Sequence, residues 1–180
     1  MSMISPCPRY NSNGIACPAL PPGQAIDYNE SSPIASGGVA LQPICKYTTP
    51  WPTLSASWVA GQSLTVVFDS YGSPHNGGHC EWSVSFDSGN TFAVVHRVLS
   101  HCFYDSNNNR VNNYTFALPA DLPSSGSAVF SWSWINASGN REFYMNCADV
   151  SITGSSSTSY TGPQMVIANY PGYPMIPEFE

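Results

Sequence analysis

The segment Glu81–Phe86 (EWSVSF) alternates large apolar side chains with small polar or charged ones. Because successive side chains of a strand point to opposite faces of its sheet, this pattern predicts a strand with its tryptophan, valine and phenylalanine on one face. The next four residues, 87–90 (DSGN), favour a tight turn, and a second apolar run begins at Phe92. The stretch therefore predicts a β-hairpin.

Segments of similar character recur at short intervals from residue 63 onward. They are Ser63–Asp69, Phe92–Val98, Asn112–Leu118, Ala128–Trp134 and Arg141–Ile152. Short strands separated by turns predict an all-β fold, an antiparallel β-sandwich. Gly162–Ala168 is expected to add an edge strand. Alternation within Phe92–Val98 puts His96 on the same face as Phe92 and Val94.

The 180 residues fit a single domain. More than half of the sixteen prolines lie in residues 1–60, which excludes long helices over most of that region. We expect long loops there, pinned by disulfides over the sheet. The predicted domain covers residues 1–170, and residues 171–180 form a Pro-rich tail without a role in the fold.

Only 9% of the residues are charged, and the net charge is -6 with five lysines and arginines. This balance argues against nucleic acid as a partner, because no basic stripe can neutralise phosphates. No stretch is long and apolar enough to span a membrane. Aromatic, hydroxyl and amide side chains suit a neutral partner such as a polysaccharide.

Six cysteines are spread along the chain without the paired spacing of a zinc site, which favours disulfides. They are Cys7, Cys17, Cys45, Cys80, Cys102 and Cys147. Glycosylation triplets at Asn29, Asn113 and Asn136 also indicate an extracellular protein. The first residues lack the features of a signal peptide, so we expect a secreted protein from which the signal peptide has been removed.

Two histidines lie close together in the loop Ser73–Cys80. His75, in a Gly-rich turn at a strand entrance, is either a metal ligand or an exposed loop residue, and imidazole suits copper and zinc. His79 stands beside a disulfide cysteine and is expected to be a bystander. No cluster of acidic residues accompanies His96 or His101, so neither is favoured as a metal ligand. A zinc hydrolase would need both loop histidines and a carboxylate to bind the metal together. A serine hydrolase is not favoured, because the candidate serines lack a G-x-S-x-G motif.

Alternation in the last predicted strand places Glu142, Tyr144 and Asn146 on one face. A phenol and a carboxylate two residues apart suit the surroundings of a metal. The alternative is a core tyrosine beside an ion pair of Arg141 with Glu142.

Several motifs together resemble the fungal lytic polysaccharide monooxygenases of auxiliary-activity family eleven, the chitin-active type. They are Met1–Pro8, His75–Cys80 leading into Trp82–Phe86, Ala128–Asn136 and Gly139–Cys147. The resemblance extends to about Ile152. It implies an immunoglobulin/fibronectin-like sandwich with copper on a flat face, held by a histidine brace. In such a brace an N-terminal histidine gives two nitrogens and a second histidine gives one.

The resemblance implies that His75 is the second brace histidine, Tyr144 the axial metal ligand and Glu142 a catalytic carboxylate near the metal. It assigns no metal role to His79. It also suggests disulfides between Cys80 and Cys102 and between Cys45 and Cys147.

The implied activity is copper-dependent oxidative cleavage of chitin or a related insoluble polysaccharide by a secreted monomer with an external electron donor. The family begins with histidine, and Met1–Met3 resembles the residues that come directly after that histidine. We therefore expect the activity to require a histidine directly before Met1. The alternative is a non-catalytic polysaccharide-binding or cell-wall protein on the same fold.

Overall fold

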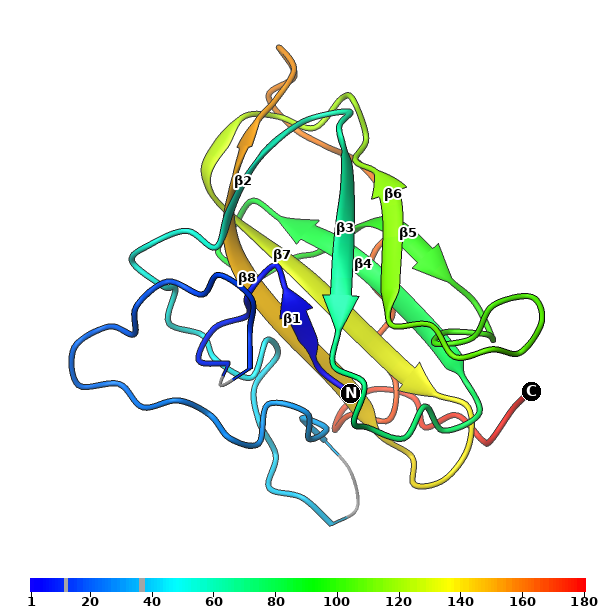
Figure 1. Ribbon diagram of the computed structural model, residues 1–180. Coiled ribbons are helices and arrows are strands. Elements are labelled where there is room, and N and C mark those ends of the chain that lie inside the picture. The colour runs from blue at the N-terminus through cyan, green and yellow to red at the C-terminus, as the bar shows by residue number, and fades with distance from the viewer. Residues whose placement is uncertain (12, 36–37) are drawn as a thin grey trace.

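The computed structural model of the chain describes residues 1–11, 13–35 and 38–180 (Figure 1). Its regular elements are all strands: β1 Met3–Ser5, β2 Ala56–Val59, β3 Ser63–Phe68, β4 Gly78–Ser85, β5 Ala93–Val98, β6 Asn113–Ala117, β7 Ser125–Asn136 and β8 Phe143–Thr153. Within these described ranges, no helix has the length and apolarity needed to cross a bilayer.

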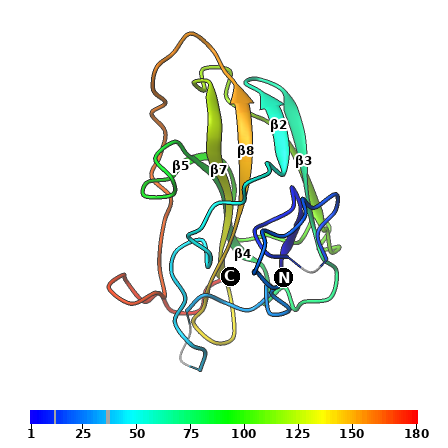
Figure 2. The same ribbon diagram turned by 90° about the vertical axis from the view of Figure 1, so that its left-hand side faces the viewer.

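The strands form two facing sheets, which confirms the predicted β-sandwich (Figures 1 and 2). One sheet has the order β1-β3-β6 and the other the order β2-β8-β7-β4-β5. Pairing is antiparallel except between β2 and β8, which run parallel with Ala56 opposite Val150. The short strands β1 and β2 lie in the region that the prolines made appear irregular.

The core between the sheets is mainly aromatic. Phe68 of the smaller sheet packs edge-on against Trp132 of the larger one, with ring centroids 4.9 Å apart. Trp82, Trp132 and Trp134 are completely buried. Their spacing along β4 and β7 follows the predicted alternation, so these large side chains all point between the sheets.

The outer face of the five-stranded sheet is also covered by chain. Ile34, Phe143 and Met145 form a second apolar cluster there with Met165 of the segment after β8. In Figure 2 this segment runs along the outside of the sheet. Serines on this face, such as Ser83 and Ser133, are therefore buried rather than exposed to solvent.

The segment expected to form an edge strand, Gly162–Ala168, pairs only locally. A single bridge joins Ala93 to Gln164, and Met165 N donates to Phe92 O over 3.1 Å. The prediction of a strand there was wrong. The segment covers apolar side chains on the outer face of the sheet and does not form a regular strand.

A bulge also changes the predicted face of His96. The pairing of β4 with β5 shifts register between Trp82 and Ser83. As a result, Phe92 belongs to the outer cluster, whereas His96 stacks on Phe116 in the core between the sheets, with ring centroids 4.3 Å apart. The parity prediction was wrong because a bulge inserts one residue into the alternation.

All six cysteines form disulfides: Cys7–Cys17, Cys45–Cys147 and Cys80–Cys102. The Cys45–Cys147 bond fastens the irregular region before β2 to the middle of β8. The Cys80–Cys102 bond joins β4 to the loop after β5. Both pairings suggested by the resemblance are present.

Candidate active site

The loop before β4 turns through consecutive residues with left-handed backbone. The φ angles are 45° at His75, 58° at Asn76, 93° at Gly77 and 116° at Gly78. Non-glycine residues seldom adopt this conformation, and such strain is found where a side chain must be aimed. His75 is thus held in a backbone conformation that is unfavourable for a non-glycine residue.

Close backbone packing explains the two glycines of the loop. A Cβ atom at Gly77 would lie 2.5 Å from Ser100 O, and one at Gly78 would lie 2.2 Å from Ile135 O. Trp134 Nε1 donates a 3.0 Å hydrogen bond to Gly77 O. The loop therefore packs against the segment after β5 at Gly77 and against β7 at Gly78, and neither position has room for a Cβ atom.

The His75 ring is held between a backbone wall and a carboxylate. Its centroid lies 5.8 Å from that of Trp134. A Cβ atom at Gly139 would lie 3.0 Å from Nδ1, so the backbone there closes one side of the ring. His75 Nε2 lies 3.9 Å from Glu142 Oε2, and the His75 side chain is 28% exposed. One ring nitrogen thus lies against the protein and the other lies near the acid.

Glu142 and Tyr144 come from the entrance of β8 and are joined by a hydrogen bond. The Tyr144 hydroxyl donates to Glu142 Oε2 over 2.7 Å. Burial, followed by this carboxylate, raises the pKa of Tyr144, which therefore stays a neutral phenol. Its ring packs against Trp134, with centroids 4.7 Å apart.

Asn146 shares their strand and holds the amino-terminal segment instead. Its Oδ1 accepts a 2.8 Å hydrogen bond from Met3 N, and its Nδ2 donates to Glu30 Oε1 over 2.8 Å. Sequence alternation placed Asn146 beside the candidate site, and the structure shows that it fixes β1 there.

The amino-terminal residues reach the loop that carries His75. A Cβ atom at Gly72 would lie 2.4 Å from Met1 N. Ser2 N donates to Asp69 Oδ1 over 3.2 Å. The charged groups of Asp69, Arg110 and Glu142 lie within electrostatic range of Met1 N. The first residues, the His75 loop and Glu142 thus meet at one end of the sandwich.

The other histidines lie apart from this cluster. His79 Nδ1 accepts a 3.0 Å hydrogen bond from Ser100 N, and burial lowers the pKa of the His79 ring. His96 stacks in the core, and His101 is exposed. Across residues 1–11, 13–35 and 38–180, no three His, Cys, Asp or Glu side chains lie close enough to hold a metal.

The donor chemistry of the cluster decides how far it suits copper. It offers one imidazole, His75, next to a carboxylate and a neutral phenol. Imidazole is a good copper ligand, whereas a protonated phenol is only a weak one. These residues fit one arm of a brace; an amine and a second imidazole are needed to complete it.

Comparison with known proteins finds relatives of the chain among curated sequences. The chain is 37% identical over 155 residues to the AA11 family lytic polysaccharide monooxygenase A of Aspergillus fumigatus, covering 82% of this chain and 66% of that protein. This chain belongs to the AA11 family of lytic polysaccharide monooxygenases. An AA11 member of Aspergillus oryzae is 28% identical, with 77% of this chain and 35% of that protein covered.

The chain spans just under two thirds of the first relative and about a third of the second. No family model matches it. Among solved structures, HiLPMO9B matches with a TM-score of 0.44 and 18% identity, over 59% of this chain and 54% of that one. A cellulose-active polysaccharide monooxygenase of M. thermophila gives 0.43 and 14%, over 59% and 57%.

The sequence pattern held no sign of two residues near the site. Asp69 and Gly72 lie outside the AA11 motifs, and their contacts are with Met1 and Ser2, which are far away in the chain. Gly139 opens one of those motifs, but its contact with the His75 ring was not foreseen.

Proposed function

We propose that this chain is the catalytic part of a secreted, copper-dependent monooxygenase that cleaves chitin or a related insoluble polysaccharide by oxidation. One observation carries the proposal: His75 Nε2 faces the carboxylate of Glu142, which is bonded to Tyr144, where the amino-terminal segment meets the same loop. The AA11 relatives supply the reaction class.

In this proposal His75 provides one copper nitrogen. The other two come from the amino group and imidazole of a histidine that directly precedes Met1 in the mature chain. Copper bound there supplies the one-electron chemistry that activates dioxygen or peroxide, with electrons from an external donor.

The surrounding residues hold this arm of the brace in place. The Trp134 ring packs against the rings of both His75 and Tyr144. Glu142 Oε2 accepts the hydrogen bond of Tyr144 and remains beside His75 Nε2. A carboxylate in this position can orient water or exchange a proton at the site.

The surface around the site suits an uncharged, hydroxyl-rich substrate. Tyr71, on the loop that leads to His75, is 93% exposed. An exposed tyrosine ring offers an apolar face and a polar edge, a combination that suits packing against a sugar ring. Three disulfides are consistent with an extracellular, oxidising location.

The test is to secrete the protein from a fungal host, sequence its N-terminus and titrate it with copper. We expect one copper per chain, oxidised oligosaccharides from chitin by mass spectrometry, and loss of copper binding in His75→Ala. The exposed residue His101 gives the control, His101→Ala, which should bind normally. Unchanged copper affinity in His75→Ala would contradict the proposal.

A second candidate is a non-catalytic polysaccharide-binding protein on the same sandwich. It is favoured by the donor set of the described residues, which offers a single imidazole at this end of the fold. A mature secreted chain that begins at Met1, binds chitin and yields no oxidised products would establish this alternative.

A further inference from the structure

The C-terminal tail packs against the loop that connects β7 to β8, residues 137–142. Phe179 N donates to Ala137 O over 3.0 Å, and Glu178 Oε1 accepts from Gly139 N over 2.6 Å. Both ribbon views place this loop and the C-terminus at the same end of the sandwich (Figures 1 and 2). The expectation that these residues have no role in the fold was wrong.

The other side of the same loop lies against His75. Ser138 N donates a 3.0 Å hydrogen bond to His75 O, and the Gly139 backbone closes the Nδ1 side of the ring. Gly139 has a φ of 90°, so its peptide orientation depends on a conformation that other residues rarely adopt. Glu178 thus holds Gly139, the residue whose backbone packs against the His75 ring.

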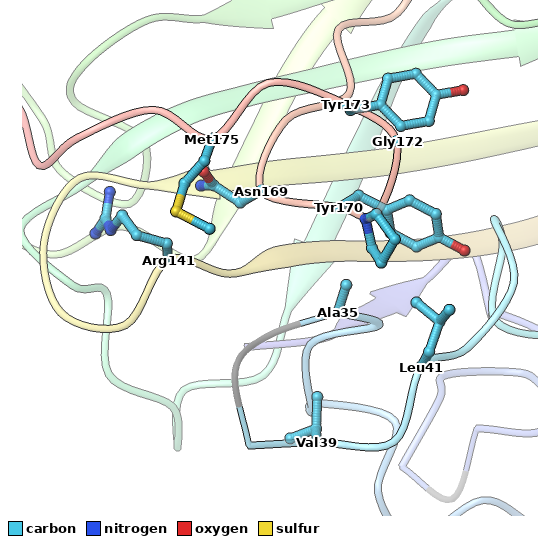
Figure 3. Close-up of a pocket in the computed structure, with 10 residues that line it drawn as sticks. Ala35, Val39, Leu41, Arg141, Asn169, Tyr170, Gly172, Tyr173 and Met175 are labelled. Atoms are coloured by element: carbon cyan, nitrogen blue, oxygen red, sulfur yellow. The ribbon is translucent and has the colours of Figure 1, made fainter.

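Asn169 forms a hydrogen bond with Glu142, at the other end of this loop. Its Nδ2 donates to Glu142 O over 3.3 Å, and its Oδ1 accepts from Ile176 N over 2.9 Å. Asn169 is 6% exposed, so these bonds are shielded from water. Figure 3 shows Asn169 and Met175 of the tail beside Arg141 of the loop, at the edge of a pocket of about 340 Å³.

Aromatic packing anchors the tail independently of these hydrogen bonds. The Phe179 ring stacks on His79 with centroids 4.5 Å apart and an interplanar angle of 17°. Arg141 Nη1 donates to Pro177 O over 3.3 Å. His79, which the resemblance leaves without a metal role, thus has a structural one.

We infer that Glu178 is a positioning residue that sets the orientation of the His75 ring through the loop 137–142. The inference rests on the proposed function for its consequence at copper. Its structural content, that Glu178 controls the surroundings of the His75 ring, does not depend on metal.

The experiment uses the full chain with its mature N-terminus, three variants of acidic residues and one variant of Phe179. Glu178→Ala removes the acceptor for Gly139 N, Glu178→Gln keeps an amide oxygen there, and Glu180→Ala changes an exposed acid for which the structure shows no such bond. NMR of the metal-free protein follows the His75 ring signals, and calorimetry measures copper(II) affinity.

We expect Glu178→Ala to shift the His75 ring signals and to weaken copper binding about fivefold, the effect of losing one hydrogen bond behind a ligand. Glu178→Gln should restore both, and Glu180→Ala should match the wild type. Unmoved His75 signals in Glu178→Ala would overturn the inference.

Two comparisons distinguish a failure of this inference from a failure of the proposed function and from general loosening of the tail. If the wild type binds no copper, the proposed function fails, while the metal-free His75 signals still test the inference. Phe179→Leu removes the stacking on His79 and leaves the Glu178 bond. An equal shift of the His75 signals in Phe179→Leu would show general loosening of the tail and overturn the specific role of Glu178.

Discussion

Tyr144 donates its hydroxyl hydrogen bond to the same Glu142 oxygen that lies 3.9 Å from His75 Nε2. Glu142 directly precedes β8 and Tyr144 is the second residue of that strand, so the extended chain sets their spacing. One carboxylate oxygen therefore links the neutral phenol to the imidazole. Its charge and its acceptor role can be separated by mutation.

Glu142→Gln should keep the fold and lose activity. The amide oxygen can still accept the Tyr144 hydrogen bond, but the side chain can neither carry charge nor exchange a proton. We expect copper affinity near that of the wild type and an oxidation rate lower by about a hundredfold. Product analysis on chitin measures the rate, and a variant as active as the wild type would refute a role for the charge.

Gly78→Ala should destabilise the protein strongly. Its φ of 116° is unfavourable for alanine, and the new Cβ atom would lie 2.2 Å from Ile135 O. We expect a loss of about 3 kcal/mol in the free energy of unfolding. Gly126→Ala is the matched control, since nothing lies within 4 Å of its Cβ position. Urea denaturation distinguishes them; equal stability would contradict the close packing.

Glu30 should make the protein less stable as the pH rises. Burial raises the pKa of Glu30 to about 8 and the Asp27 carboxylate adds to the shift, whereas Lys46 opposes it. An unfolded glutamate has a pKa of about 4.3, so between about pH 4.5 and 8 the native state holds a proton that the unfolded state has lost. Unfolding free energy therefore falls across this window.

Glu30→Gln tests this linkage because glutamine does not titrate. Melting temperatures from pH 4.5 to 8 should fall less in Glu30→Gln than in the wild type, while Glu180→Gln, an exposed control, should follow the wild type. Parallel melting curves for the wild type and Glu30→Gln would show that Glu30 does not titrate in this range.

Tyr71→Ala should weaken binding to insoluble chitin without affecting copper. Its ring is exposed on the loop before His75, and loss of one aromatic contact predicts about fivefold weaker adsorption. Tyr28, which is 81% exposed on a different loop, provides the control Tyr28→Ala. Equal adsorption of the two variants would argue against a substrate contact at Tyr71.

The three glycosylation triplets should not be used equally. Asn29 and Asn113 are exposed, whereas Asn136 is completely buried and its Nδ2 donates to Ser138 O over 2.7 Å. A glycan on Asn136 would be incompatible with the folded chain. Peptide mapping of protein secreted from a eukaryotic host should find glycans at the first two positions only; an occupied Asn136 in folded material would contradict the structure.

The sequence revealed the main strands because one face of each is apolar. Segments such as Glu81–Phe86 and Ala128–Trp134 carry that alternation, and the strands β4 and β7 include nearly all of it. The bulge at Trp82 was not predictable, since it depends on how β4 and β5 pair. The strands β1 and β2 were not predicted either. β1 is too short to show an alternating pattern, and β2 depends on parallel pairing with β8.

The site was predictable where a motif marks it. The structure brings together His75, Glu142 and Tyr144, as the resemblance implied, and their roles at copper stay a prediction. The supports were not predictable. Glu178 lies 39 residues from Gly139, and no local pattern signals that a glutamate will accept a hydrogen bond from a distant backbone amide.

Both faces of the five-stranded sheet are covered by other parts of the chain, and this affects amide hydrogen exchange. Strand β7 is paired on both edges, with β4 and β8, and every residue from Ala128 to Asn136 is buried. Water reaches its amide hydrogens only when the sandwich and the outer segment separate together. Deuterium uptake by β7 therefore reports the opening of the whole domain, whereas uptake by β6, which ends the smaller sheet, reports local fraying.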